Sequence, residues 1–310
     1  MLKYGVKRFL FMILTLWVLI TITFALMHAI PGDPIAAQSR KLPPQIRQNL
    51  YEKYGLNKPK YEQYGLFLKN LVTKFDLGES YTYPGTTVND IIKEKAPVSG
   101  VLGIESLALG LIIGVICGIV AAFHKNSLPD YVVMFLAIVG IAVPSFVLAA
   151  LLQYFFTVKF MLLPTVGWGS FKYTILPSLA MSFGVIATYA RYTRSSCIEV
   201  MNQDYILTAE AKGVSKVSLT VNHILRNAMM PIITILGMQL ASVLTGTFVI
   251  ESIFSIPGIG RYFVSCISNM DYPVILGTTI FVGFLFIVSI FVVDMLYAVI
   301  DPRIRVSGKK

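Results

Sequence analysis

The stretch TAEAKGVSKVSLTVNHILRNAMMP, residues 208–231, decides how this chain is organised. It lies between two strongly apolar segments, yet it carries Glu210, Lys212, Lys216, His223 and Arg226. Charged side chains are costly in hydrocarbon and are kept out of it. We therefore expect this stretch to connect two membrane-embedded segments while itself meeting water.

The same region predicts two short helices joined by a bend. Asp204 or Asn202 can cap a helix that runs through Lys212, and Gly213 can end it, because glycine tolerates the left-handed conformation of a helix terminus. Ser215 can cap a second helix, whose apolar stripe is expected to be Val217, Val221, Ile224 and Ala228. Two interpretations stay open: an amphipathic elbow on the membrane surface, or a rigid handle that a cytoplasmic partner grips.

The composition indicates a membrane protein. Of 310 residues, 55% are hydrophobic and only 14% are charged, whereas a soluble domain carries about 25% charged residues. The net charge is +10, and membrane proteins retain Lys and Arg on their cytoplasmic side. The sequence shows neither a basic face nor a recognisable nucleic-acid-binding module, so nucleic acid is not expected as a partner.

Six apolar segments are long enough to cross a bilayer as helices of about 20 residues. They run near 9–30, 98–123, 131–158, 173–192, 231–250 and 274–300. The first is too long for the apolar part of a signal peptide and lacks an A-x-A cleavage site, so we interpret it as a retained helix. The fold class expected is an all-α membrane protein with six transmembrane helices.

The basic residues set the expected orientation. With the N-terminus inside, the cytoplasmic segments hold thirteen Lys and Arg residues and the short outer loops hold three, as the positive-inside rule requires. Loops above about 60 residues do not enter that count. Both termini are therefore expected in the cytoplasm.

The orientation divides the chain into four expected regions. Residues 1–30 hold the N-terminal tail and the first helix, and residues 31–97 form an extracytoplasmic loop. Residues 98–300 form a five-helix core with a cytoplasmic connection at 193–230, and residues 301–310 form a cytoplasmic tail.

Aromatic residues recur at helical spacing in the long outer loop: Tyr51, Tyr54, Tyr61, Tyr64 and Phe67. An interfacial helix with an aromatic belt explains this pattern. A small extracytoplasmic cap that receives a partner or substrate explains it equally well.

Small residues predict which helix faces meet, because helices in lipid associate through close packing. The stripes are Ser106, Gly110, Gly114 and Gly118 in the second segment and Gly237, Ala241 and Thr245 in the fifth. Glu105 and Asp294 are the ionisable residues expected within segments, and a structural or interfacial role is favoured for both over a proton relay. The three cysteines and three histidines are scattered, so no metal site is expected.

TAEAKG followed by RNAMMP resembles the EAA loop of binding-protein-dependent ABC transporter permeases, in the form found in their oligopeptide, dipeptide and nickel branch (B-type subunit). Four further stretches are similar to that branch: HAIPGDP (28–34), TRSSCIEVMNQDYILTAEAKG (193–213), ESIFSIPGIGRYFVSCISNMDYPVILG (251–277) and DPRIR (301–305). The resemblance covers essentially the whole chain. It departs at Glu210, where the branch often has Arg.

The resemblance implies a cell-membrane permease subunit of type I ABC importer architecture, forming half of a translocation pore. The implied partners are a second homologous permease subunit, two cytoplasmic nucleotide-binding subunits and an extracytoplasmic solute-binding protein. Because the chain lacks G-x-x-x-x-G-K-[ST], ATP and Mg²⁺ are expected on the ATPase subunits, and the chain is not expected to be an enzyme. The residues expected to couple to the ATPase are Asp204, Tyr205, Thr208, Ala209, Glu210, Ala211, Lys212, Gly213, Val217 and Arg226.

The segment 254–263 is expected to dip into the outer mouth of the pore, since irregular backbone at membrane depth is tolerated only where protein buries it or it lines water. Its gate candidates are Phe254, Pro257, Gly258 and Gly260. The branch handles dipeptides, longer peptides and chelated nickel, and the scattered histidines and cysteines favour peptides. A carrier driven by an ion gradient and a purely structural scaffold stay as alternatives.

Overall fold

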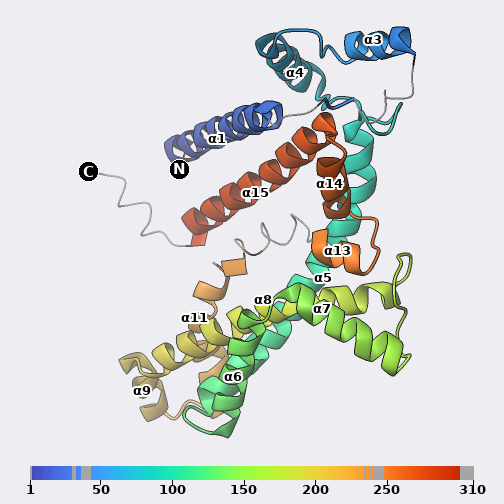
Figure 1. Cartoon of the computed structure of the whole chain (residues 1–310). Coiled ribbons are helices and arrows are strands. Elements are labelled where there is room, and N and C mark those ends of the chain that lie inside the picture. The colour runs from blue at the N-terminus through green and yellow to red at the C-terminus, as the bar shows by residue number, and fades with distance from the viewer. Residues whose placement is uncertain are drawn as a thin grey trace. The chain divides into compact units, whose positions relative to one another are not determined.

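The computed structural model describes residues 2–29, 33–35, 43–233, 235–236, 239 and 248–300. Within these residues the regular structure is helical, apart from one isolated bridge between Glu79 and Thr87. The predicted all-α fold class is therefore confirmed (Figure 1).

Four described helices are long and apolar enough to cross a membrane. They are α1 (Leu2–Ala29), α5 (Val88–Phe123), α8 (Phe171–Met201) and α15 (Tyr272–Ile300). They correspond to the first, second, fourth and sixth expected segments, although α5 and α8 extend well beyond the expected bounds. The fifth expected segment, 231–250, falls mostly outside the described residues.

The third expected segment is not one straight helix. It consists of α6 (Leu128–Ala142), then α7 (Ser145–Gln153), which continues into the π-helical turn η1 (Tyr154–Lys159), and the two parts meet at 101°. Pro144 causes the break, because proline lacks a backbone N–H and drives the preceding residue into extended conformation. Val143 accordingly has φ −85° and ψ 122°. The sequence predicted a membrane span over 131–158 from its apolarity and did not foresee this break; whether the bent pair forms one span stays a prediction.

The chain divides into two compact units, each described by itself below. Unit 1 comprises residues 1–99, 245–248 and 257–291, and unit 2 comprises 100–244, 249–256 and 292–310. This division by contacts differs from the expected division by topology, since the expected core 98–300 contributes to both units. The expected boundaries at 30, 97 and 300 stay predictions about membrane topology.

Unit 1 contains a folded cap in the region predicted as a long outer loop. Its helices α3 (Pro44–Lys53) and α4 (Lys60–Lys74) are joined by a short turn. Tyr54, Tyr64 and Phe67 pack against a core that includes Val88, Tyr272 and Val274, whereas Tyr61 is 75% exposed. The aromatic residues therefore face different ways, which fits a packed cap better than a single interfacial belt.

Unit 2 is built on a close seam between α5 and α8. A Cβ placed on Gly110 would lie 2.4 Å from Val185 Cγ1, and a Cβ on Gly114 or Gly118 would lie 2.7 or 2.6 Å from a backbone oxygen of α8. Only glycine permits that approach. The other predicted packing residue, Gly237, lies outside the described residues together with Ala241 and Thr245.

Of the two ionisable residues expected within the apolar segments, Glu105 and Asp294, the structure describes the side chain of Glu105. Glu105 accepts a hydrogen bond from Ser178 Oγ at 2.7 Å, which joins α5 to α8. The favoured structural role for Glu105 is consistent with this bond. The side chain of Asp294 lies outside the described part of the chain.

Candidate functional site

The connection after α8 forms a bent element that we call the handle, residues 204–228. Its first helix, α9 (Asp204–Ala211), has Lys212 as its C-cap and is followed by Gly213, whose φ is +74°. The Gly213 N–H donates to Glu210 O at 2.9 Å and the Val214 N–H donates to Ala209 O at 3.2 Å, the two bonds of a Schellman motif. The predicted glycine bend is present. The predicted N-cap is wrong: Gln203 occupies that position, without a side-chain cap.

The second part of the handle differs from the predicted amphipathic helix. Ser215 caps it as predicted, accepting from the Ser218 N–H at 3.4 Å. It then passes through α10 (Lys216–Ser218), the π-helix η2 (Leu219–Leu225) and α11 (Arg226–Ala228). Its buried residues are Leu219, Ile224 and Ala228, whereas Val217 and Val221 are 75% and 53% exposed. The predicted stripe fails at these two valines because π-helical bonds widen the turn and change which residues share a face.

The handle is seated on the ends of two long helices. Ile206 and Ala209 of α9 and Ile224 of η2 join one buried cluster with Ala122 of α5 and Cys197 of α8. Ile206 and Ile224 are 2% and 3% exposed, and burying such a side chain contributes about 1.5–3 kcal/mol. Figure 1 shows α9 and α11 close to the end of α8. The handle therefore forms one packed body with the ends of α5 and α8.

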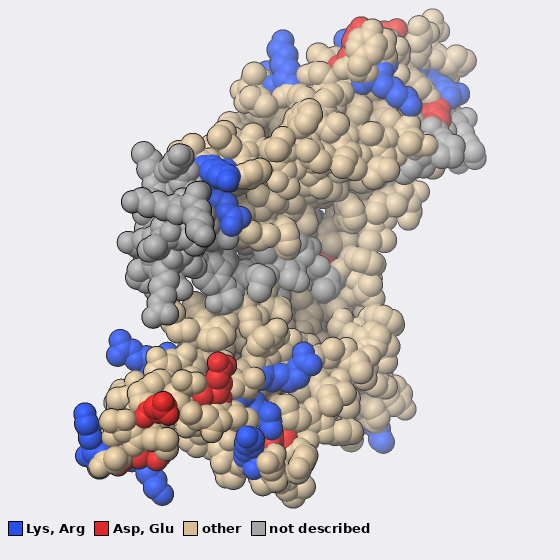
Figure 2. Space-filling model, turned by 90° about the vertical axis from the view of Figure 1, so that its left-hand side faces the viewer, with Lys and Arg blue, Asp and Glu red and all other residues tan. Residues whose placement is uncertain are grey.

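The outward face of the handle holds most of the residues predicted to couple to a partner. Ala209 is buried in the cluster just described. The exposed ones are Asp204, Tyr205, Thr208, Glu210, Ala211, Lys212, Gly213, Val217 and Arg226. In the space-filling view, charges of both signs gather over the end of unit 2 that carries the handle (Figure 2). Exposed apolar side chains stand among these charges, with Leu207 60% and Val217 75% exposed.

A partly buried ion pair lies near the end of α8, with the Asp130 side chain 2% exposed and that of Arg194 25% exposed. Arg194 of α8 donates from Nε to Asp130 Oδ1 at 2.5 Å and from Nη2 to Oδ2 at 2.7 Å. The N–H of Asn126 donates to Asp130 Oδ2 at 2.9 Å, and Asp130 is only 2% exposed. Sequence reasoning counted Arg194 only for topology and missed Asp130. The spacing of Ser127 and Asp130 signals a helix start, but no single-sequence signal pairs Asp130 with a residue 64 positions away.

The four gate candidates fall in different units. Phe254 belongs to unit 2, where it is 2% exposed and its carbonyl oxygen accepts from the Gly167 N–H at 2.9 Å. Pro257, Gly258 and Gly260 belong to unit 1. There Gly258 is the N-cap of α14 (Ile259–Ser268), which follows α13 (Phe248–Ile253) in the chain. All four are wholly or partly buried, and whether any lines a pore stays a prediction.

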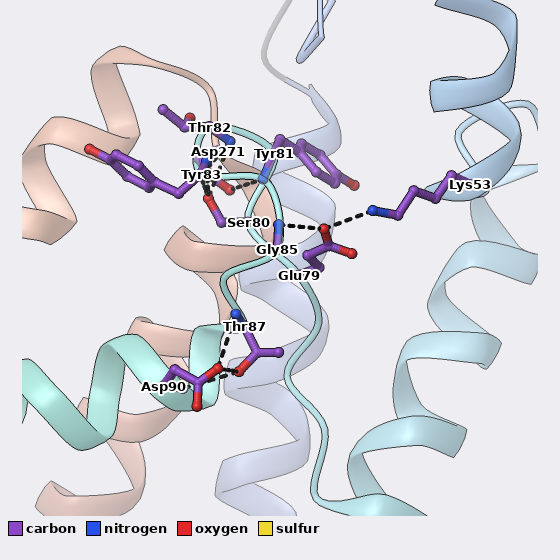
Figure 3. Close-up of polar contacts among 10 residues, drawn as sticks. All are labelled: Lys53, Glu79, Ser80, Tyr81, Thr82, Tyr83, Gly85, Thr87, Asp90 and Asp271. Carbon is purple, nitrogen blue, oxygen red and sulfur yellow. Dashed lines mark hydrogen bonds and ion pairs between the residues drawn. The ribbon is translucent and has the colours of Figure 1, made fainter. Parts of the chain in front are cut away.

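A second polar network lies in unit 1, where the cap meets the start of α15 (Figure 3). The Asp271 carboxylate is fully buried and accepts from Ser80 Oγ at 2.5 Å and from the Tyr81 and Thr82 N–H groups at 3.1 Å each. Ser80 Oγ in turn accepts from the Tyr83 N–H at 2.9 Å. The sequence analysis singled out the stretch 251–277, which contains Asp271, but did not connect it to residues 80–83 of the long outer loop.

Glu79 anchors the other side of the same loop (Figure 3). Its carboxylate accepts from Lys53 Nζ at 2.7 Å and from the Gly85 N–H at 2.9 Å. The hydrogen bond from Lys53, followed by that from Gly85, holds the pKa of Glu79 below its ordinary value. The loop between α4 and α5 is therefore pinned both to α3 and to the turn before α15.

Comparison with known proteins places this geometry in a family context. Residues 114–306 match the family described as binding-protein-dependent transport system inner membrane component, and residues 1–102 match the corresponding N-terminal region. The dipeptide transport system permease protein DppB of Bacillus subtilis is 45% identical over 309 residues, covering 100% of both chains. The oligopeptide transport system permease protein OppB of Haemophilus influenzae is 43% identical over 307 residues, covering 98% of this chain and all of that one.

A solved structure agrees on the fold. The chain is similar to a crystal structure of an amino acid ABC transporter with histidines, with a TM-score of 0.52 and 15% identity. The similarity covers 69% of this chain and 94% of the other. At this level of identity the likeness concerns the fold alone.

Proposed function

The chain belongs to the family of binding-protein-dependent transport system inner membrane components, and from that membership we propose that it is the permease subunit of an ATP-driven importer of peptides. It is a multi-pass membrane protein. It forms half of a pore whose other half is a second homologous permease subunit. A solute-binding protein delivers the cargo from outside, and two cytoplasmic subunits hydrolyse ATP with Mg²⁺.

Peptides are the proposed cargo because full-length relatives at 41–45% identity are named dipeptide or oligopeptide permeases. Chelated nickel is the other cargo of the branch that the motifs resemble. Among the described residues no group of three or more His, Cys, Asp and Glu side chains could hold a metal ion, so nothing in that part of the chain favours nickel over peptides.

The observation that carries the coupling proposal is the construction of the handle. A partner can move a transmembrane helix only through an element that is exposed, stiff and attached to that helix. The handle has an exposed face with Val217 75% accessible, a bend fixed by two backbone hydrogen bonds, and a buried attachment to α5 and α8. The ATPase drives transport if it binds the handle differently in its two states.

Uptake by the assembled transporter in vesicles tests this function. We expect labelled alanine peptides of two to five residues to accumulate only with ATP on the handle side and the solute-binding protein on the other. A nickel–histidine chelate should not compete, and a proton or sodium ionophore should not abolish uptake. Gradient-driven uptake by the isolated chain would establish the alternative of a secondary carrier, and accumulation of the chelate alone would overturn the peptide assignment.

A further inference from the structure

The ion pair of Asp130 and Arg194 joins three elements of unit 2. Asp130 lies in the first turn of α6, Arg194 lies near the end of α8, and the Asn126 N–H that also binds Asp130 belongs to the turn after α5. Asn126 has φ +61°, so this turn adopts a left-handed conformation beside the carboxylate. One buried side chain thus fixes the start of α6 to the two helices on which the handle is seated.

Stability alone does not account for such a pair. The cost of burying the Asp130 carboxylate offsets part of its attraction to Arg194, and because the Arg194 side chain stays 25% exposed, water weakens that attraction further. What a bidentate pair provides is geometry, because the guanidinium fork accepts a carboxylate in one orientation. The pair of Asp130 and Arg194 therefore sets the position of α6 along α8.

The far end of the α6–α7 pair is fixed as well. α6 lies close along α8, where a Cβ on Gly140 would be 3.1 Å from Phe183 O. Beyond the 101° bend, Gln153 at the end of α7 donates from Nε2 to Thr165 O at 2.9 Å and to Ile253 O at 3.3 Å. Ile253 directly precedes Phe254, the gate candidate of this unit.

We propose that α6 and α7 form a transmission arm between the handle and the segment at Ile253 and Phe254. The ion pair of Asp130 and Arg194 attaches the arm to α8 at the handle end. The hydrogen bonds of Gln153 attach it at the other end. These three are positioning residues for coupled transport. The proposal rests on the proposed function, because it presumes that an ATPase moves the handle.

A double-mutant cycle in the assembled transporter tests the arm. Asp130→Asn and Gln153→Leu each break one attachment, and both are measured alone and together by alanine-peptide uptake per ATP hydrolysed. Each single variant should lower that ratio about tenfold, which is a typical size for coupling between two sites. ATP hydrolysis itself should continue. If both residues act through one arm, the uptake per ATP of the double variant should be no lower than that of the single variant with the larger loss. Glu62→Gln, on the exposed face of α4, is the control and should change nothing.

A second readout follows the gate segment directly. Ser252→Cys, in a background with the partly exposed Cys117 replaced by alanine, should change its labelling rate when vanadate traps the ATPase. That change should disappear in Asp130→Asn. If this variant fails to fold, the apolar pair Asp130→Leu with Arg194→Leu leaves no buried charge unpaired and should fold yet stay uncoupled.

The outcomes separate the inference from the function on which it rests. Additive losses in the double variant, or parallel losses of ATP hydrolysis and uptake together with thermal stability, would show that the residues only support the fold. A wild-type protein that transports peptides with ATP, beside variants that keep its ratio, would overturn the arm alone. A wild-type protein that does not couple uptake to ATP would overturn the proposed function.

Discussion

Replacement of Gly213 tests whether the bend of the handle transmits force. Gly213 has φ +74°, and a Cβ there would meet no atom within 4 Å in the part of the chain that the structure describes. The cost expected from adding a side chain is therefore backbone strain, about 1–2 kcal/mol for an ordinary residue in the left-handed region. That strain changes the ratio of bent to straightened handle by roughly 5- to 30-fold.

Two substitutions at Gly213 form a matched pair. Gly213→Val introduces a β-branched residue that rarely adopts positive φ, whereas Gly213→Asn introduces one that tolerates this conformation. We expect both variants to assemble with the ATPase, because the buried attachment through Ile206 and Ile224 is untouched. Peptide uptake per ATP hydrolysed should fall by roughly 5- to 30-fold in the valine variant and stay near the wild-type value in the asparagine variant.

The assay measures ATP hydrolysis and alanine-peptide uptake on the same vesicles, with the amount of assembled complex determined by gel filtration. A valine variant that assembles and transports like the wild type would refute the role of the bend. Equal losses in the valine and asparagine variants would refute the reasoning from backbone conformation, because only one of them should carry strain.

Three further predictions concern packing and charge. Gly114→Ala should lower the thermal unfolding temperature, because its Cβ would lie 2.7 Å from a backbone oxygen of α8 and overpacking costs about 1–3 kcal/mol. Gly184→Ala should not lower it, because its Cβ would meet no atom of the described residues within 4 Å. Tyr189→Phe removes a buried hydroxyl that has no hydrogen-bond partner among the described residues, so the unfolding temperature should hold or rise, and a fall would contradict that reasoning. The hydrogen bond from Lys53 lowers the pKa of Glu79. The ionised Glu79 therefore contributes stability above the ordinary Glu pKa, and this contribution is lost as pH falls through the lowered pKa. The thermal unfolding temperature of Glu79→Gln, measured across an acid pH series, should depend less on pH than that of the wild type.

The sequence predicted features that depend on local chemistry. Gly213 and Ser215 were placed correctly, because helix ends are decided by backbone conformation and one side-chain oxygen. The glycine stripe of α5 was also found from spacing alone, and Gly110, Gly114 and Gly118 lie against α8. In each case the signal lies within a few residues of the feature that it predicts.

Features that depend on tertiary contacts were missed or predicted wrongly. The π-helix at 219–225 exposed Val221, which the 3.6-residue period had placed on the buried stripe. The contacts of the Asp130 and Asp271 carboxylates gave no recognisable signal, since their partners lie far away in the sequence. Pro144 is visible in the sequence, but the prediction for the third segment rested on its uniform apolarity and took no account of the proline.

Cysteine labelling at Val217 tests most directly whether a cytoplasmic ATPase grips the handle. Val217 is 75% exposed on the outward face of the handle. Val217→Cys should react with a membrane-impermeant maleimide in inside-out vesicles, be silent in intact cells, and become protected when the ATPase subunits are added back to stripped vesicles. Labelling in intact cells, or unchanged labelling after the ATPase binds, would contradict the placement of the handle and its role.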